Sequence, residues 1–65
     1  MKKYKVTFNC IGDRVINLVF NDDQHTELLN TRPDGYFTFR MGEKRSYIIN
    51  MRNVVSIYIH EYEED

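Results

Sequence analysis

A cluster of potential metal ligands lies in the longest stretch of the chain that lacks strand-like alternation. It consists of two aspartates, a histidine and a glutamate: Asp22, Asp23, His25 and Glu27. Carboxylates and imidazole bind divalent cations, but this spacing matches neither an EF-hand loop nor two histidines one helical turn apart. Acidic clusters are also common on solvated surfaces. We therefore expect no metal and no cofactor.

Catalytic groups are sparse. Cys10 is the single cysteine, and alternation places it on the core-facing side of a strand, where a free thiol acts as a small buried hydrophobic group. A reactive thiolate needs an electropositive, partly exposed setting. The three glycines are isolated turn residues rather than a phosphate-binding loop. The sequence predicts that the protein is not an enzyme, and the lone cysteine favours the reducing cytoplasm.

Aromatic side chains near the C-terminus form the first candidate binding site. Tyr58, His60 and Tyr62 recur at every second position, so a strand presents all three on one face. Tyrosine is favoured at protein interfaces because its ring is apolar and its hydroxyl forms hydrogen bonds. In the alternative interpretation, curvature of the sheet buries part of this row against the long loop. The first interpretation predicts that Tyr58, His60 and Tyr62 bind a protein partner.

A second apolar face also indicates self-association. Further apolar side chains, at Val15, Val19 and Ile48, fall on the opposite side of their strands from the core-facing rows. A chain of 65 residues has little of its own to cover that face. We expect an oligomer, most simply a two-fold dimer.

Nucleic-acid binding is the alternative function. An aromatic residue and four basic residues, Tyr36, Arg40, Lys44, Arg45 and Arg52, lie along the third and fourth expected strands and just after them. Small β-barrels often stack bases on aromatic side chains beside basic groups. The net charge of −1 and the acidic end at 61–65 weigh against this function, since both repel phosphates.

Composition predicts the elements that position these residues. The chain has no alanine and only three leucines, but fifteen valine, isoleucine and threonine residues and nine aromatic residues. β-branched and aromatic side chains favour strands. Alternation then marks five strands, with the apolar rows Tyr4-Val6-Phe8-Cys10, Ile16-Leu18-Phe20, Phe37-Phe39-Met41, Tyr47-Ile49-Met51 and Val55-Ile57-Ile59.

The connections constrain the register. A two-residue turn at Gly12-Asp13 would set the first two apolar rows on opposite faces. A three-residue loop, or a bulge with Gly12 in the left-handed region, restores one face. The segment 22–34 forms either a short helix, capped by Asp22, Asp23 or Thr26 and packed through Leu28 or Leu29, or a long loop.

These features together predict one all-β domain spanning 1–65. A five-stranded antiparallel meander of this size must curl or pair with another chain, because a flat sheet leaves two open edges. The order of elements favours a small SH3-like or Sm-like barrel. There is no apolar run long enough to cross a membrane and no apolar core of a signal peptide. The expected function is a non-enzymatic binding and assembly module that docks through its last strand.

Overall fold

The structure is a computed structural model and describes residues 1–64. Over this range the elements follow in the order β1 (Lys2–Cys10), β2 (Arg14–Phe20), α1 (Asp22–Leu29), β3 (Tyr36–Met41), β4 (Arg45–Asn50), the 3-10 turn η1 (Met51–Asn53) and β5 (Val54–Glu63). The prediction of a largely β protein with five strands is confirmed. The open choice between helix and loop after β2 is decided in favour of a helix.

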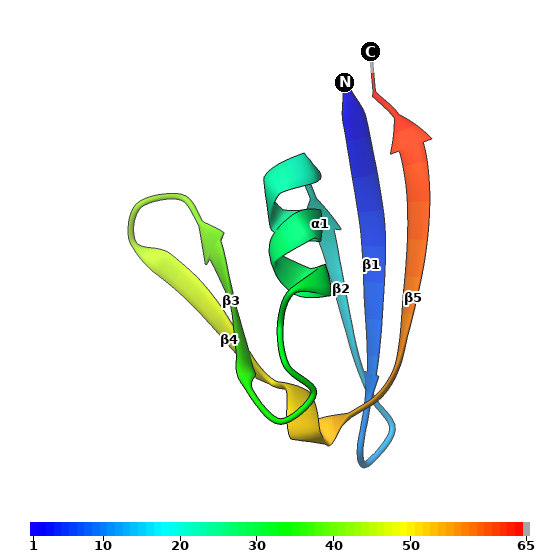
Figure 1. The fold of residues 1–65 in the computed structure, drawn as a ribbon, viewed down its shortest axis with the longest axis vertical. Helices are drawn as coiled ribbons and strands as arrows, with labels where there is room; N and C mark the ends of the chain where they lie inside the picture. The colour runs from blue at the N-terminus through cyan, green and yellow to red at the C-terminus, as the bar shows by residue number, and fades with distance from the viewer. Residues whose placement is uncertain (65) are drawn as a thin grey trace.

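The strands form two antiparallel sheets (Figure 1). One sheet has the order β2-β1-β5, and the other is the hairpin β3-β4. The predicted single meander is therefore wrong: β2 does not pair with β3, and β4 does not pair with β5. The segment containing α1 separates β2 from β3, and η1 redirects the chain so that β5 pairs with β1 instead. The strands of residues 1–64 form no closed sheet.

The first hairpin has the register that the apolar pattern requires. Cys10 pairs with Arg14, which leaves a three-residue loop, and Phe8 pairs with Ile16. Gly12 has φ 79° and Asp13 has φ 60°, so two successive residues occupy the left-handed region. Glycine adopts this region without a steric penalty, and aspartate tolerates it better than most residues. The odd loop length predicted from the two apolar rows is confirmed.

The helix α1 begins with a capping box. The Asn21 side chain accepts a hydrogen bond from the Gln24 N–H at 2.8 Å, and the Gln24 side chain accepts one from the Asn21 N–H at 2.9 Å. The cap predicted at Asp22, Asp23 or Thr26 is thus wrong. Asparagine followed three residues later by glutamine satisfies two orphan donors reciprocally, whereas the aspartates lie in the first turn and favour it through their charge.

A cluster of phenylalanines joins the two sheets. Phe20 of β2 stacks on Phe37 and Phe39 of β3, with ring centroids 5.3 and 5.0 Å apart, and Phe8 lies beside Phe20. The core comprises the residues that these elements bury together: Tyr4, Val6, Phe8, Phe20, Leu28, Phe37, Phe39 and Ile49. Seven of the eight come from the alternating apolar rows, and Leu28 is one of the two leucines expected to pack a helix on the sheet.

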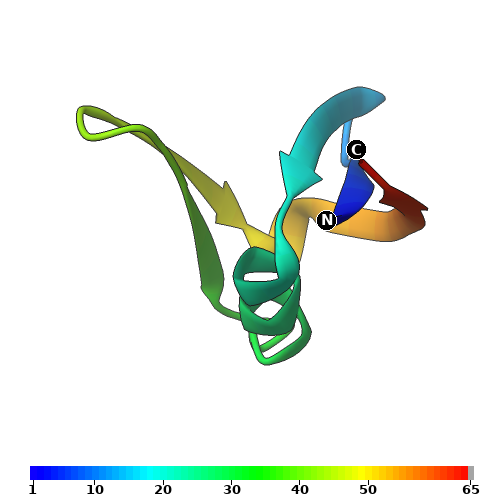
Figure 2. The same cartoon turned by 90° about the horizontal axis from the view of Figure 1, so that it is seen from above.

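The hairpin β3-β4 extends away from this core toward its tip, as Figure 2 shows. Two predicted core residues near the tip, Met41 and Tyr47, are about two-fifths exposed because no other element formed by residues 1–64 covers the end of the hairpin. At the opposite end η1 connects the sheets: Ile11 N–H donates to the Asn53 carbonyl at 2.8 Å, and Met51 N–H donates to the Gly35 carbonyl at 3.0 Å. No helix among residues 1–64 has the length and apolarity to cross a bilayer.

Candidate interaction surface

The strand β5 forms one edge of the three-stranded sheet. It runs for ten residues beside β1, and no strand of residues 1–64 pairs with its other side. An edge strand of this length presents a row of backbone donors and acceptors on which a further strand can form. In Figure 1 it lies at the outside of the molecule, on the far side of β1 from β2.

Tyr58, His60 and Tyr62 form the outer row of β5, on the sheet face opposite the core. They pair with Thr7, Lys5 and Lys3 of β1, respectively. The His60 and Tyr62 rings are stacked with centroids 6.4 Å apart, and Lys5 Nζ lies 5.4 Å from the Tyr62 ring centre. These contacts leave Tyr62 half-buried, while Tyr58 stays 65% exposed. The alternation that grouped the three residues is confirmed, and neither the helix nor the long loop covers the row.

Ile57 and Ile59 form the inner row of β5, on the core side. They pair with Phe8 and Val6, which are fully buried, yet they remain 37% and 36% exposed. They line an apolar groove of about 480 Å³ together with the end of α1 and the loop after it. We call this the β5 groove; its apolar lining comprises Leu28, Leu29, Pro33, Met51, Val54, Val55, Ile57 and Ile59.

A β-bulge changes the start of β5. Asn9 pairs with Ser56 but Cys10 pairs with Val54, so Val55 is an extra residue in the ladder. As a result Val54 packs against the core and Val55 is 73% exposed. The prediction that Val55 begins the core-facing row is wrong. An alternating pattern cannot reveal a bulge, because the inserted residue reverses the faces of the residues that precede it.

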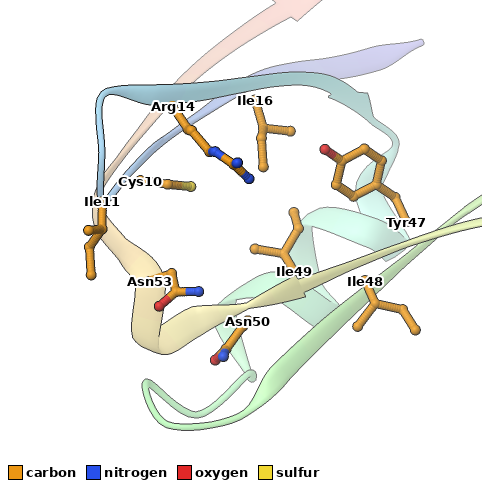
Figure 3. A pocket seen from close by; sticks show the side chains of 9 residues that line it. All are labelled: Cys10, Ile11, Arg14, Ile16, Tyr47, Ile48, Ile49, Asn50 and Asn53. Carbon is orange, nitrogen blue, oxygen red and sulfur yellow. The ribbon is translucent and has the colours of Figure 1, made fainter.

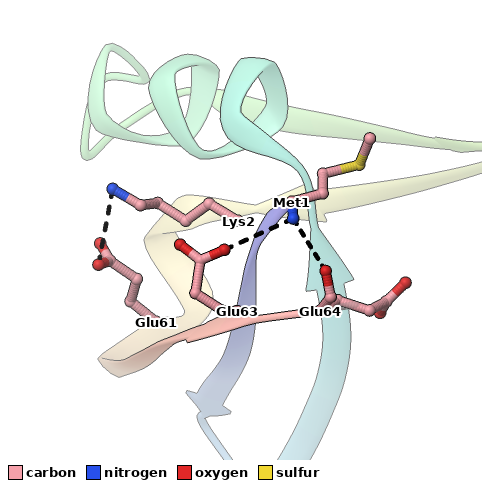
Figure 4. A network of polar contacts seen from close by, with 5 residues as sticks. All are labelled: Met1, Lys2, Glu61, Glu63 and Glu64. Carbon is pink, nitrogen blue, oxygen red and sulfur yellow. Dashed lines mark hydrogen bonds and ion pairs between the residues drawn. The ribbon is translucent and has the colours of Figure 1, made fainter.

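Charged groups concentrate at the end of β5 (Figure 4). Lys2 Nζ lies 3.7 Å from Glu61, and the N-terminal amine of Met1 lies 3.5 Å from Glu63. The same amine donates to the Glu64 carbonyl at 2.8 Å, and the Glu64 N–H donates to the Met1 carbonyl at 2.8 Å. Exposed ion pairs contribute little stability, so the backbone pairing is the stronger constraint on this end.

A second hollow, of about 440 Å³, lies between β2 and β4 (Figure 3). Arg14 and Ile16 point into it from β2, and Tyr47 and Ile49 point into it from β4. The polar groups of its lining are a guanidinium, a phenol, a thiol and two amides. Arg14 gives this hollow a positive charge.

The potential metal ligands of 22–27 have other contacts. The Asp22 carboxylate accepts a hydrogen bond from the Tyr4 hydroxyl at 2.7 Å, and His25 stacks on the Tyr4 ring at 3.9 Å. Within residues 1–64 no three His, Cys, Asp or Glu side chains are arranged to hold a metal ion. Cys10 is half-buried and unpaired, with Sγ 4.0 Å from the Phe8 carbonyl oxygen.

The basic residues of the alternative site are only partly brought together. Tyr36, Thr38 and Arg40 share one face of β3, and Lys44 lies in the turn that joins β3 to β4. Arg45 pairs with Met41 and therefore belongs to the opposite face. Arg52 lies in η1, at the far end of the hairpin from Lys44. Arg40 also shares a hollow with Glu27 of α1.

Comparison with models of known protein families, with curated proteins and with solved structures finds no match to this chain. The candidate sites are therefore identified from the positions and contacts of their own residues.

The β5 groove is the feature that sequence reasoning missed. Alternation assigned Ile57 and Ile59 to the core, and they remain accessible because no element in the described part of the chain covers this side of β5. One sequence signal could have indicated it: 42% of the 65 residues are hydrophobic, which is a large share for a chain too short to bury them all.

Proposed function

We propose that this chain is a non-enzymatic binding and assembly module whose contact element is β5, and that it self-associates through this strand. The observation that carries the proposal is the exposure of apolar and aromatic side chains on both faces of an edge strand whose outer side has no partner among residues 1–64: Ile57, Tyr58 and Ile59. Soluble monomers usually shield such an edge with charges, proline or a covering segment. The middle of β5 has none of these, and its carboxylates begin only at Glu61.

We also propose that the two sheets belong to a small barrel of the SH3-like or Sm-like kind. The barrel is open because β2 and β3, which lie in different sheets, do not pair. Three features support it: the antiparallel pairing of β5 with β1, the 3-10 turn directly before β5, and the phenylalanine cluster that the two sheets enclose. A cytoplasmic location remains a prediction from the single cysteine.

The solution mass tests the assembly function. Light scattering over a concentration series is expected to show a dimer or larger species that dissociates on dilution. The double variant Tyr58→Ser/Tyr62→Ser removes two aromatic rings from the outer row, and we expect it to weaken the oligomer. Circular dichroism checks that the variant is folded.

The matched control is Tyr36→Ser, because Tyr36 is 67% exposed, similar to Tyr58, but lies on the hairpin β3-β4. The control is expected to keep the wild-type mass. A wild-type chain that stays monomeric at every concentration would contradict the proposal of self-association.

Nucleic-acid binding is the second candidate function. One observation favours it: the hairpin with Tyr36, Arg40 and Lys44 lies on the opposite side of the molecule from the acidic end of β5 (Figure 1). The carboxylates of that end therefore do not cover the basic residues.

A further inference from the structure

We propose that two copies of this chain join β5 to β5 in antiparallel orientation, so that their two three-stranded sheets become one six-stranded sheet with Tyr58 at the two-fold axis. This inference rests on the proposed self-association and specifies its geometry. The occupant of the free edge of β5 is thus a second copy of the same strand.

The backbone of β5 shows which groups are free. Met1 and Glu64 exchange two hydrogen bonds, both of 2.8 Å. Along an antiparallel ladder such pairs alternate with pairs that exchange none. Tyr62, His60 and Tyr58 therefore bond to β1 in the same way as Glu64. The N–H and C=O groups of Ile57, Ile59, Glu61 and Glu63 point instead toward the free edge.

These free groups limit the register of a second β5. Hydrogen bonds across the new edge must join odd-numbered residues to odd-numbered residues, which also keeps the inner rows on one face of the combined sheet. With Tyr58 opposite its own copy, Ile57 lies opposite Ile59 of the second copy and bonds to it. The two-fold axis repeats this pair, so four isoleucines form a continuous apolar row.

Neighbouring registers are less favourable. A shift of two residues toward the C-terminus sets Glu61 opposite Ile57 of the second copy, which places a carboxylate in the isoleucine row. A shift toward the N-terminus moves Ile59 opposite Val55, the bulged residue, where the regular ladder ends. The Tyr58-centred register is therefore the one that joins isoleucine to isoleucine over the regular part of the strand.

Charge also favours this arrangement over a parallel one. In the antiparallel pair the acidic end of each β5 lies beside the start of the other copy's β5, close to the exposed Arg52. Arg52 forms no ion pair within residues 1–64. A parallel pair would set Glu61 and Glu63 alongside their own copies, and like charges directly opposite each other destabilise a sheet.

The β5 groove fits the same occupant. A two-fold axis that joins sheet edges runs perpendicular to the sheet, so the grooves of both copies lie on one face, flanking the joined strands. Leu29, which is 65% exposed at the end of α1, then faces the combined isoleucine row from each side. Pairing of this kind reduces the exposure of the groove without moving either core.

Disulfide trapping tests the register. The substitution Tyr58→Cys is made together with Cys10→Ala, so that residue 58 carries the only thiol of the variant. In a non-hydrogen-bonded antiparallel pair the Cα atoms lie about 4.5 Å apart, which is within the range that a disulfide spans. Loss of the Tyr58 ring weakens the reversible dimer, but a disulfide traps each dimer that forms. Mild oxidation is therefore expected to accumulate a covalent dimer of this variant on a non-reducing gel.

His60→Cys in the same background is the matched control, because His60 is exposed on the same face of the same strand. In the proposed register its two copies are separated by four residues along the sheet, roughly 13 Å, which is too far for a disulfide. Little covalent dimer is therefore expected.

A second variant tests the edge without a thiol. Ile59→Lys introduces a charge in the new isoleucine row and is expected to give a monomer by light scattering. Tyr36→Lys introduces the same charge at an exposed position on β3, away from β5, and should keep the wild-type mass. A wild-type oligomer that cross-links better through residue 60 than through residue 58, or that survives Ile59→Lys, would overturn this geometry and leave the assembly function standing. A wild-type monomer would overturn both.

Discussion

Tyr4 combines burial with a strong hydrogen bond to a carboxylate. Its ring is buried and stacked on His25, and its hydroxyl donates to the Asp22 carboxylate at 2.7 Å. This hydrogen bond, followed by burial and by the negative charges of Asp22, Glu61 and Glu63, raises the pKa of Tyr4 from 10.0 to about 12. Ionisation would remove the donated proton and set a phenolate against a carboxylate.

The raised pKa predicts a loss of stability in alkaline solution. The folded state holds the Tyr4 proton more tightly than the unfolded state, so the free energy of unfolding keeps this contribution below pH 10 and loses it between about pH 10 and 12. Urea denaturation at a series of pH values measures this fall. Tyr4→Phe is expected to be less stable at neutral pH but to lose less stability over this alkaline range. An ultraviolet titration in which all five tyrosines ionise near pH 10 would contradict the prediction.

At the scale of the element, α1 depends on its first turn. It has only eight residues, too few for a helix to persist alone in water. The capping box at Asn21 and Gln24 supplies the N-terminal hydrogen bonds, and Leu28, which is 5% exposed, anchors the other end on the core. The position of α1 in turn keeps β2 and β3 apart and forms one wall of the β5 groove.

Asn21→Ala is therefore expected to lower the free energy of unfolding by about 1 kcal/mol, the usual cost of losing an N-cap. Equilibrium urea denaturation measures the change. Asn21→Ser is the matched control, because serine caps helices about as well as asparagine and should stay close to wild type. Equal losses in both variants would show that the side chain acts through some contact other than the cap.

At the scale of the whole molecule, charge is unevenly distributed. Glu61, Glu63 and Glu64 lie at one end of β5, while Arg40 and Lys44 lie on the hairpin β3-β4 (Figure 1). The net charge of −1 is therefore the sum of a basic region and an acidic region whose charges nearly cancel. This separation is what keeps nucleic-acid binding open as a second function.

If the hairpin binds nucleic acid, the affinity for a labelled single-stranded oligonucleotide should fall steeply as salt rises. Arg40→Ala should weaken binding at low salt and reduce the slope of log K against log salt by about 0.7 for a lost phosphate contact. Tyr58→Ser should leave binding unchanged. Fluorescence anisotropy measures both, and an absence of binding at low salt would exclude this function.

The local features of the fold could be predicted from the sequence. Alternation located the five strands and seven of the eight core residues, and the mismatch of the first two apolar rows predicted the three-residue loop around Gly12. The eighth, Leu28, was one of two leucines expected to pack a helix on the sheet. The two-residue period of a strand also predicted that Tyr58, His60 and Tyr62 lie on one face. These features depend on residues near one another in the chain, where backbone geometry fixes which way each side chain points.

Only the tertiary structure decided which strands pair and which surfaces stay open. The partners of β5, the separation of β2 from β3, and the bulge at Val55 depend on contacts between distant segments. The alternating pattern of a strand does not show which other strand pairs with it, because the same alternation suits any partner strand with an apolar face. The sequence by itself thus determined the five strands and the residues that form most of the core. The tertiary structure decided that β5 is an edge with an exposed groove, because no element of residues 1–64 covers it.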